Sequence, residues 1–261
     1  MKKNHFFIPY YGNKRTEVEK IYNVIKDDID KYNTIVEPFC GTSAFSYYVW
    51  LNNKDKNLSY VLNDNNKFLI ELYNISKDEE KFKNLYNNLI LLQEATANKQ
   101  KYLEVVKKAD SDLISYIYVH KVYNIRPGLY PTGKTFTADS WKTFLNAPII
   151  DFIRNAKITF LNKDALEVYN EYKTNKKALI FLDPPYLASE NSWYNNPSVN
   201  IYEYLFENDI LKEKALIVLC LENNWIIKML FKGKKSIVYD KKYEATKKKT
   251  EHIIIINKKQ I

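Results

Sequence analysis

The chain is poor in several residue types, and each shortage excludes a class of protein. Two cysteines, Cys40 and Cys220, in 261 residues exclude a disulfide framework and a zinc knuckle. Five glycines leave no room for a Gly/Ser linker, and no internal repeat is present. No apolar run approaches the roughly 18–20 residues that span a bilayer, and the N-terminus lacks the apolar core of a secretory signal. We therefore expect a soluble, cytoplasmic protein with no membrane segment, built as one domain or as one domain with an insertion.

Arginine is scarce as well, and the positive charge is unevenly distributed. Of 40 Lys+Arg, three are arginine (Arg15, Arg126 and Arg154), and the formal net charge is +9. Residues 212–261 hold 13 Lys and 5 acidic residues, a net +8, which leaves +1 for residues 1–211. A basic segment on an otherwise neutral chain indicates contact with a polyanion, although a solvated surface explains the same charge equally well.

Apolar strands alternate with helical stretches, which predicts an α/β fold with a doubly wound, mostly parallel sheet. Strands are expected at 34–39, 59–64, 158–161, 178–183, 215–221, 236–239 and 252–256, and helices at 43–51, 67–122, 142–155, 199–211 and 222–231. Residues 123–140 are dense in Pro, Gly, Thr and Tyr and predict a loop or hairpin. Ligands of such sheets bind beyond the carboxyl ends of the strands, so we expect the chemistry just after Phe39, Asp64 and Asp183.

The sequence Asp183-Pro184-Pro185-Tyr186 directly follows one of these strands. The prolines fix the backbone angle φ and offer carbonyls without N–H groups. An Asp carboxylate and the Pro184 carbonyl can together accept the two hydrogens of a planar amino group, while Tyr186 stacks on the ring that carries it. The alternative is a structural one, in which the strand ends in a Pro-rich turn with a buried tyrosine.

Two further segments are weaker signals when taken alone. The turn Glu37-Pro38-Phe39-Cys40-Gly41 lets a ligand approach the backbone, and Asp64 lies about 20 residues on, where a carboxylate can hold ribose hydroxyls. A tight turn and a surface carboxylate explain them equally well. The N-terminal segment at 7–14 holds an aromatic pair, Tyr10 and Tyr11, near Lys14. These residues can pack on a ligand and pair with its carboxylate, or the segment simply docks on the core.

In this order the segments resemble the Dam-type (alpha-group) adenine-N6 DNA methyltransferases over nearly the whole chain. The resemblance implies a Rossmann-like methyltransferase fold, a catalytic domain formed by 1–74 and 151–261, and a helical and loop target-recognition (DNA-binding) insertion at 75–150. It implies S-adenosylmethionine as the methyl donor, S-adenosylhomocysteine as the product, and no metal. The catalytic residues it implies are Asp183, Pro184 and Tyr186. The cofactor-binding residues it implies are Tyr10, Lys14, Pro38, Phe39, Gly41, Ser43, Asp64, Asp164 and Asp183.

The resemblance extends to a DNA-reading hairpin at 123–134. By this resemblance Tyr123 and Asn124 act near the space that the target base leaves, and Arg126 is a candidate base reader, because guanidinium forks fit guanine O6 and N7. A phosphate contact is the alternative for Arg126. The full set of candidate DNA-binding residues is Tyr123, Asn124, Arg126, Lys134, Lys247, Lys248 and Lys249. The hairpin differs in length from the family pattern by one residue, so no family target site is carried over.

The implied activity is methyl transfer to N6 of a flipped adenine in double-stranded DNA. The implied location is the cytoplasm, for a bacterial or a viral protein, wherever the target DNA resides. Two alternatives remain open: an N4-cytosine or RNA amino-group methyltransferase, and a catalytically silent DNA-binding protein of the same fold. Thr42-Ser43 stands where the family commonly places a second glycine, which is a departure in the donor loop. A cognate restriction nuclease is compatible with this interpretation, as is either a monomer or a weak dimer.

Overall fold

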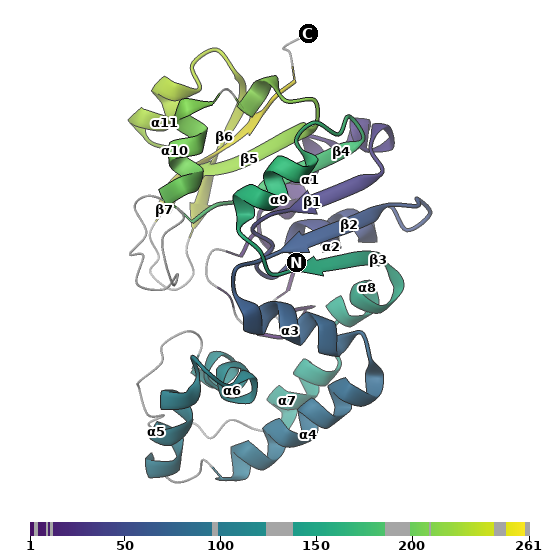
Figure 1. Cartoon of the computed structure of the whole chain (residues 1–261), viewed down its shortest axis with the longest axis vertical. Helices are drawn as coiled ribbons and strands as arrows, with labels where there is room; N and C mark the ends of the chain where they lie inside the picture. Colours follow the sequence, from purple (N-terminus) through teal and green to yellow (C-terminus); the bar gives the residue numbers. More distant parts are fainter. Residues whose placement is uncertain are drawn as a thin grey trace.

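The computed structural model describes residues 1–2, 5–8, 10, 13–95, 99–123, 138–185, 199–208, 210–242 and 249–258. A 7-stranded sheet with the order β3-β2-β1-β4-β5-β7-β6 forms its centre (Figure 1). The strands are β1 (Thr34–Glu37), β2 (Ser59–Asn63), β3 (Lys157–Leu161), β4 (Ala178–Leu182), β5 (Leu216–Glu222), β6 (Lys235–Lys242) and β7 (Lys249–Ile256). The first five run parallel, and β7 is antiparallel to both β5 and β6.

Helices cover both faces of the sheet. Their bounds are α1 (Val18–Asn23), η2 (Lys26–Lys31), α2 (Ala44–Leu51), α3 (Lys67–Ser76), α4 (Glu79–Ala95), α5 (Lys99–Lys108), α6 (Leu113–Tyr123), α7 (Ala138–Leu145), α8 (Ile149–Asn155), α9 (Ala165–Tyr172), α10 (Val199–Glu207), η4 (Ile210–Lys212) and α11 (Trp225–Leu230). On β4, Leu179 and Phe181 face the core formed with α1, α2, α3 and α8, whereas Ile180 and Leu182 face the core formed with α9, α10 and α11. Since successive strand residues point to opposite faces, a strand covered on both sides is apolar throughout.

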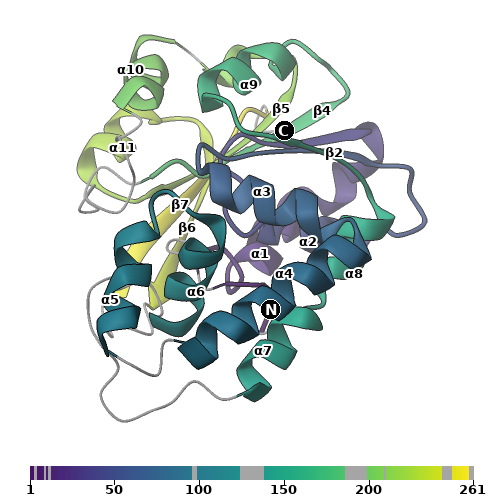
Figure 2. The ribbon, with the colours of Figure 1, turned by 60° about the horizontal axis from the view of Figure 1, so that its bottom comes forward.

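The helices α4, α5, α6 and α7 gather at one end of the molecule, beyond α3 (Figures 1 and 2). The N-terminal segment ties this group to the rest of the protein. The ring of Phe7 lies 5.3 Å from Phe82 of α4 and 5.4 Å from Phe144 of α7, and Phe7 also contacts Tyr73 of α3 at 6.2 Å between ring centroids. No helix in the described ranges is long and apolar enough to cross a membrane.

The α/β class and the mostly parallel, doubly wound sheet are confirmed, and every expected strand is present. The helical stretch expected near 142–155 is present as two helices, because the chain turns at Pro148, which precedes α8. The loop expected at 123–140 was wrong at its described ends, since Tyr123 ends α6 and α7 begins at Ala138. Residues 138–140 therefore belong to a helix rather than to the expected loop, of which 124–137 lies outside the described residues. The division at 75 and 150 stays a prediction.

Candidate active site

Parallel strands bring the predicted site residues to one edge of the sheet. Asp183 and Pro184 follow β4 directly, Pro38 and Phe39 follow β1, and Asp64 follows β2. β1 pairs with both β2 and β4, so these three strand ends are neighbours. This is the edge at which doubly wound sheets bind their ligands. The expected grouping is therefore seen.

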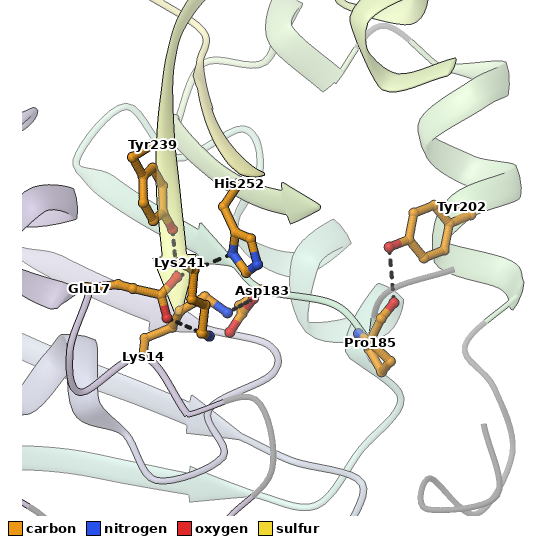
Figure 3. Close-up of polar contacts among 8 residues, drawn as sticks. All are labelled: Lys14, Glu17, Asp183, Pro185, Tyr202, Tyr239, Lys241 and His252. Atoms are coloured by element: carbon orange, nitrogen blue, oxygen red, sulfur yellow. Dashed lines mark hydrogen bonds and ion pairs between the residues drawn. The ribbon is translucent and has the colours of Figure 1, made fainter. Parts of the chain in front are cut away.

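The catalytic acid expected after β4 is paired with the N-terminal segment (Figure 3). The Lys14 ammonium lies 2.5 Å from Asp183 Oδ1, and Lys14 is 4% exposed. Burial alone would lower the pKa of Lys14, but the charges of Asp183 and Glu17 outweigh it and raise that pKa well above its usual range. Burial also raises the pKa of Asp183, and Lys14 opposes this rise. Lys14 was expected to serve the cofactor; its observed partner is Asp183, the expected catalytic acid.

Beyond Asp183, Pro184 is buried. The carbonyl of Pro185 accepts a hydrogen bond of 2.9 Å from the Tyr202 hydroxyl of α10, which anchors the chain as it leaves the strand. Tyr186, the expected stacking ring, lies outside the described residues.

The turn between β1 and α2 is the expected donor loop, and its backbone is tightly held. Gly41 has φ +47°, and a Cβ there would lie 3.3 Å from the ring of Tyr10, so glycine suits this position both in conformation and in space. Its N–H donates to Asp64 Oδ2 at 2.9 Å, and its carbonyl accepts from the Tyr73 hydroxyl at 2.6 Å. Thr42-Ser43 stands where the family commonly has a second glycine, and Ser43 has φ +55°. Ser43 therefore adopts the left-handed backbone conformation that favours glycine.

Asp64 and Asn63 bind neighbouring backbone groups. Asp64 Oδ1 accepts from the N–H of Asn66, and burial raises the pKa of Asp64 while the N–H groups of Asn66 and Gly41 oppose the rise. The Asn63 amide donates to the Pro38 carbonyl at 2.9 Å and to the Lys163 carbonyl at 3.1 Å, and Asn63 accepts from the Lys163 N–H. One buried amide thus connects the ends of β1, β2 and β3.

Asp164, expected to contact the donor adenine, is exposed at the start of α9. Its carboxylate accepts from the Leu166 N–H at 2.8 Å and so caps the helix. Phe39 is half-buried and packs against the core formed with α9, α10 and α11.

Several residues important to this site were not predicted from the sequence. Asn63 and Tyr73 stand inside segments that were singled out, and their polar side chains amid apolar neighbours were an available signal. Glu37 is the first residue of the predicted donor loop, and no role was predicted for it. It is 2% exposed and accepts from the Ser46 N–H at 2.8 Å. Glu17, which lies in the turn after Lys14, carried no local signal.

The candidate DNA-binding residues lie largely outside the described ranges. Tyr123 ends α6, and Lys249 opens β7, where it pairs with Lys242 of β6. Because β6 runs parallel to β5, these two strand ends lie at the same edge as Asp183. Asn124, Arg126, Lys134, Lys247 and Lys248 fall outside the part that the structure describes.

A doubly wound sheet with its polar site at the carboxyl ends of β1, β2 and β4 defines a Rossmann-like protein. A family model of the D12 class N6 adenine-specific DNA methyltransferases matches residues 10–245. The chain belongs to this family, which confirms the expected resemblance, the fold class and the activity: it is an adenine-specific DNA methyltransferase.

Two other comparisons add little to this assignment. Among solved structures, the rRNA methyltransferase aviRa from Streptomyces viridochromogenes is similar at a TM-score of 0.42 and 11% identity, covering 98% of this chain and 91% of that chain. No curated protein sequence matches. The family match favours DNA over the RNA alternative.

Proposed function

We propose that methyl transfer takes place at the end of β4, where Asp183 and the main-chain carbonyl of Pro184 accept the two N6 hydrogens of a flipped adenine. The observation that carries this proposal is the position of an acid that is 15% exposed and directly followed by proline, at the edge where the strand ends meet. The amino group is out of reach inside a duplex, so the base must leave the stack at a cost of a few kcal/mol. Tyr186 is proposed to recover part of that cost by stacking.

The ion pair with Lys14 is compatible with this role. A carboxylate offers about four acceptor sites, and Lys14 contacts Oδ1. With the two hydrogens drawn toward Asp183 and Pro184, the nitrogen lone pair is directed away from the base plane and toward the methyl donor. Orientation and fixed dipoles supply the catalysis, and no covalent enzyme intermediate is needed.

The residues around the donor loop fit S-adenosylmethionine, which supplies the transferred methyl group when bound. Gly41 presents a backbone without Cβ in a left-handed turn, which lets a ligand approach the main chain. Asp64 accepts from the Gly41 N–H of the loop through Oδ2 and from the Asn66 N–H before α3 through Oδ1, and it has further lone-pair sites for ribose hydroxyls. We assign the contact with the donor adenine to Asp164. The remaining contacts with S-adenosylmethionine are assigned to the N-terminal segment and the donor loop, through Tyr10, Lys14, Pro38, Phe39, Gly41 and Ser43.

The DNA side of the proposal rests on the sequence and on the sheet topology. Lys247, Lys248 and Lys249 are assigned salt-sensitive phosphate contacts, because their connection begins and ends at the edge that carries Asp183. Base reading is assigned to the segment with Tyr123, Asn124, Arg126 and Lys134. Residues 75–150, with α4 to α7, are proposed as the target-recognition unit. A monomer or weak dimer, a cognate nuclease and a cytoplasmic location stay predictions.

Sequencing of modified bases in DNA from cells that express the protein tests the function. Wild type is expected to leave N6-methyladenine at one recognition sequence, and Asp183→Ala to leave none while its circular dichroism spectrum is retained. Asp151→Ala is the matched control, because Asp151 is exposed and forms a surface pair with Lys54. Methylation by Asp183→Ala at the wild-type rate would refute the mechanism. Methylcytosine would favour the N4 alternative, and an intact fold that binds no S-adenosylmethionine in calorimetry would favour the silent DNA-binding protein.

A further inference from the structure

A buried group of polar side chains lies next to the Lys14–Asp183 pair, and the reaction as proposed does not use it (Figure 3). We name Glu17, Tyr239, Lys241 and His252 the Glu17 cluster. Glu17 is 3% exposed, Lys241 8% and His252 0%. Charged side chains are buried at a cost in solvation, so a cluster of them beside a catalytic acid calls for a physical explanation.

Glu17 is the centre of the cluster. Its Oε1 accepts the Tyr239 hydroxyl at 2.7 Å and lies 3.2 Å from His252 Nδ1. Its Oε2 lies 2.6 Å from the Lys241 ammonium. Both carboxylate oxygens are therefore engaged by partners from β6 and β7.

The pairing of β6 with β7 explains why these three partners meet. Tyr239 and His252 are directly opposite in the register, and Lys241 is two residues beyond Tyr239 on the same face of β6. The hairpin thus presents a hydroxyl, an imidazole and an ammonium to a single carboxylate. The rigidity of a paired ladder fixes the place of Glu17.

Glu17 in turn fixes Lys14 through the backbone. The N–H of Glu17 donates to the Lys14 carbonyl at 2.8 Å, and the N–H of Val18 donates to the same carbonyl at 2.9 Å. Lys14 and Glu17 are therefore the two ends of one turn. One end is anchored on β6 and β7, and the other end holds Asp183 at the end of β4.

We propose that Glu17 is a positioning residue for methyl transfer: it keeps the Lys14 ammonium on Asp183, both by anchoring the turn and by neutralising Lys241. This inference rests on the proposed function of Asp183. It adds a residue that touches neither substrate nor cofactor and assigns a role to the β6–β7 hairpin inside the catalytic domain.

The charge balance shows what the loss of Glu17 does. The cluster and the catalytic pair together contain two ammonium groups, Lys14 and Lys241, and two carboxylates, Glu17 and Asp183. Burial lowers the pKa of Lys241, as does the nearby charge of Lys14, whereas Glu17 opposes both effects. In Glu17→Gln the two ammonium groups share one carboxylate, so Lys241 competes with Lys14 for Asp183 and disturbs the acceptor of the target amino group.

Single-turnover methyl transfer measures this effect directly. Glu17→Gln keeps an oxygen for Tyr239 and His252, and we expect its rate to fall by about 10- to 100-fold, as for a reacting group displaced by about 1 Å. The dissociation constant for a duplex carrying the recognition site is expected to stay within about twofold of wild type. Lys241→Met is expected to lose rate as well, because Glu17 then competes with Asp183 for Lys14. The double variant Glu17→Gln/Lys241→Met restores a balanced pair and is expected to recover to within a few-fold of wild type.

The matched control is Glu213→Gln, which removes a carboxylate from a half-buried pair with Lys173. Glu213 precedes β5, at the opposite end of that strand from the site, and its variant is expected to transfer methyl groups at the wild-type rate. The assays are run well below the unfolding temperature of each variant, so that a loss of rate reflects folded enzyme. A Glu17→Gln rate equal to wild type, or a loss that follows only the unfolded fraction, would overturn the proposal.

A crystal structure of Glu17→Gln separates this proposal from the proposed function. We expect the Lys14–Asp183 distance to exceed about 4 Å, the limit for an ion pair, with Lys241 moved toward Asp183. An unchanged Lys14–Asp183 contact overturns the role of Glu17 whatever the activity. If wild type methylates no DNA, the proposed function fails, and the crystal structure still decides whether Glu17 holds Lys14 in place.

Discussion

The buried carboxyl of Glu37 predicts that this enzyme loses stability as the pH rises through neutrality. Glu37 is the last residue of β1 and is 2% exposed. Burial raises its pKa to about 8; the Ser46 hydrogen bonds oppose the rise, and the charge of Asp183 adds to it. The folded protein thus keeps a proton on Glu37 at a pH at which the unfolded chain, with the ordinary value of 4.5, has released it.

The sign and size follow from proton linkage. An acid whose pKa is higher in the folded state favours folding at low pH, and stability is lost as the pH rises from the unfolded value to the folded one. Each pH unit corresponds to about 1.4 kcal/mol, so Glu37 alone lowers the free energy of unfolding by on the order of 4 kcal/mol between pH 5 and pH 8. Glu37→Gln keeps an oxygen for the Ser46 N–H and has no proton to lose, so it escapes this loss.

Urea unfolding followed by circular dichroism at pH 5, 6, 7 and 8 measures the effect. Wild type and Glu37→Gln are expected to be similar at pH 5, and the variant is expected to become progressively more stable than wild type toward pH 8. The difference between the two cancels the titration of all other groups, and the same measurement on Glu213→Gln provides the baseline. A difference that does not change with pH, or one that favours wild type at high pH, would refute the reasoning.

Two smaller predictions concern the donor loop. Tyr73→Phe removes the hydrogen bond to the Gly41 carbonyl but keeps the ring stacked on Phe160, and it should lower the free energy of unfolding by about 1–2 kcal/mol in urea; a loss below a few tenths would mean that water replaces the hydroxyl at no cost. Ser43→Gly removes about 1 kcal/mol of strain from a left-handed backbone conformation in the folded protein. Glycine also makes the unfolded chain more flexible, which offsets about half of this gain, so the temperature of thermal unfolding should rise slightly. Ser46→Gly, in the helix that follows, should shift it downward, and the same direction for both variants would contradict the argument.

The sheet and the position of the site were predictable because they depend on local patterns. The apolar run before Asp183 marks a strand covered on both faces, and the parallel connection that this implies places its end beside those of β1 and β2. Asp183, Asp64 and Gly41 could therefore be expected at one edge from the sequence alone.

The surroundings of Asp183 could not be predicted, because they depend on distant pairing. Glu17 meets Tyr239 across 222 residues of sequence, and a single acidic residue near the N-terminus looks the same whether it is solvated or buried. The place of β7 between β5 and β6 brings those partners together. The ends of β6 and β7 are lysine-rich and pair beyond their apolar centres, so that the strands extend past the apolar residues expected at 236–239 and 252–256.

The strand order also sets the time at which the last part of the sheet can form during synthesis of the chain. β6 joins the sheet through β7, which is the later of the two to leave the ribosome. Until residues 249–256 have emerged, β5 lacks this neighbour and β6 has no strand of the sheet to pair with. Glu17 also lacks its contact with His252 until then. Domains fold in the order of synthesis where their contacts are local, but β6 must wait for β7, the last strand, before it can join this sheet. A nascent chain thus carries Asp183 long before it carries the strands that complete the surroundings of that acid.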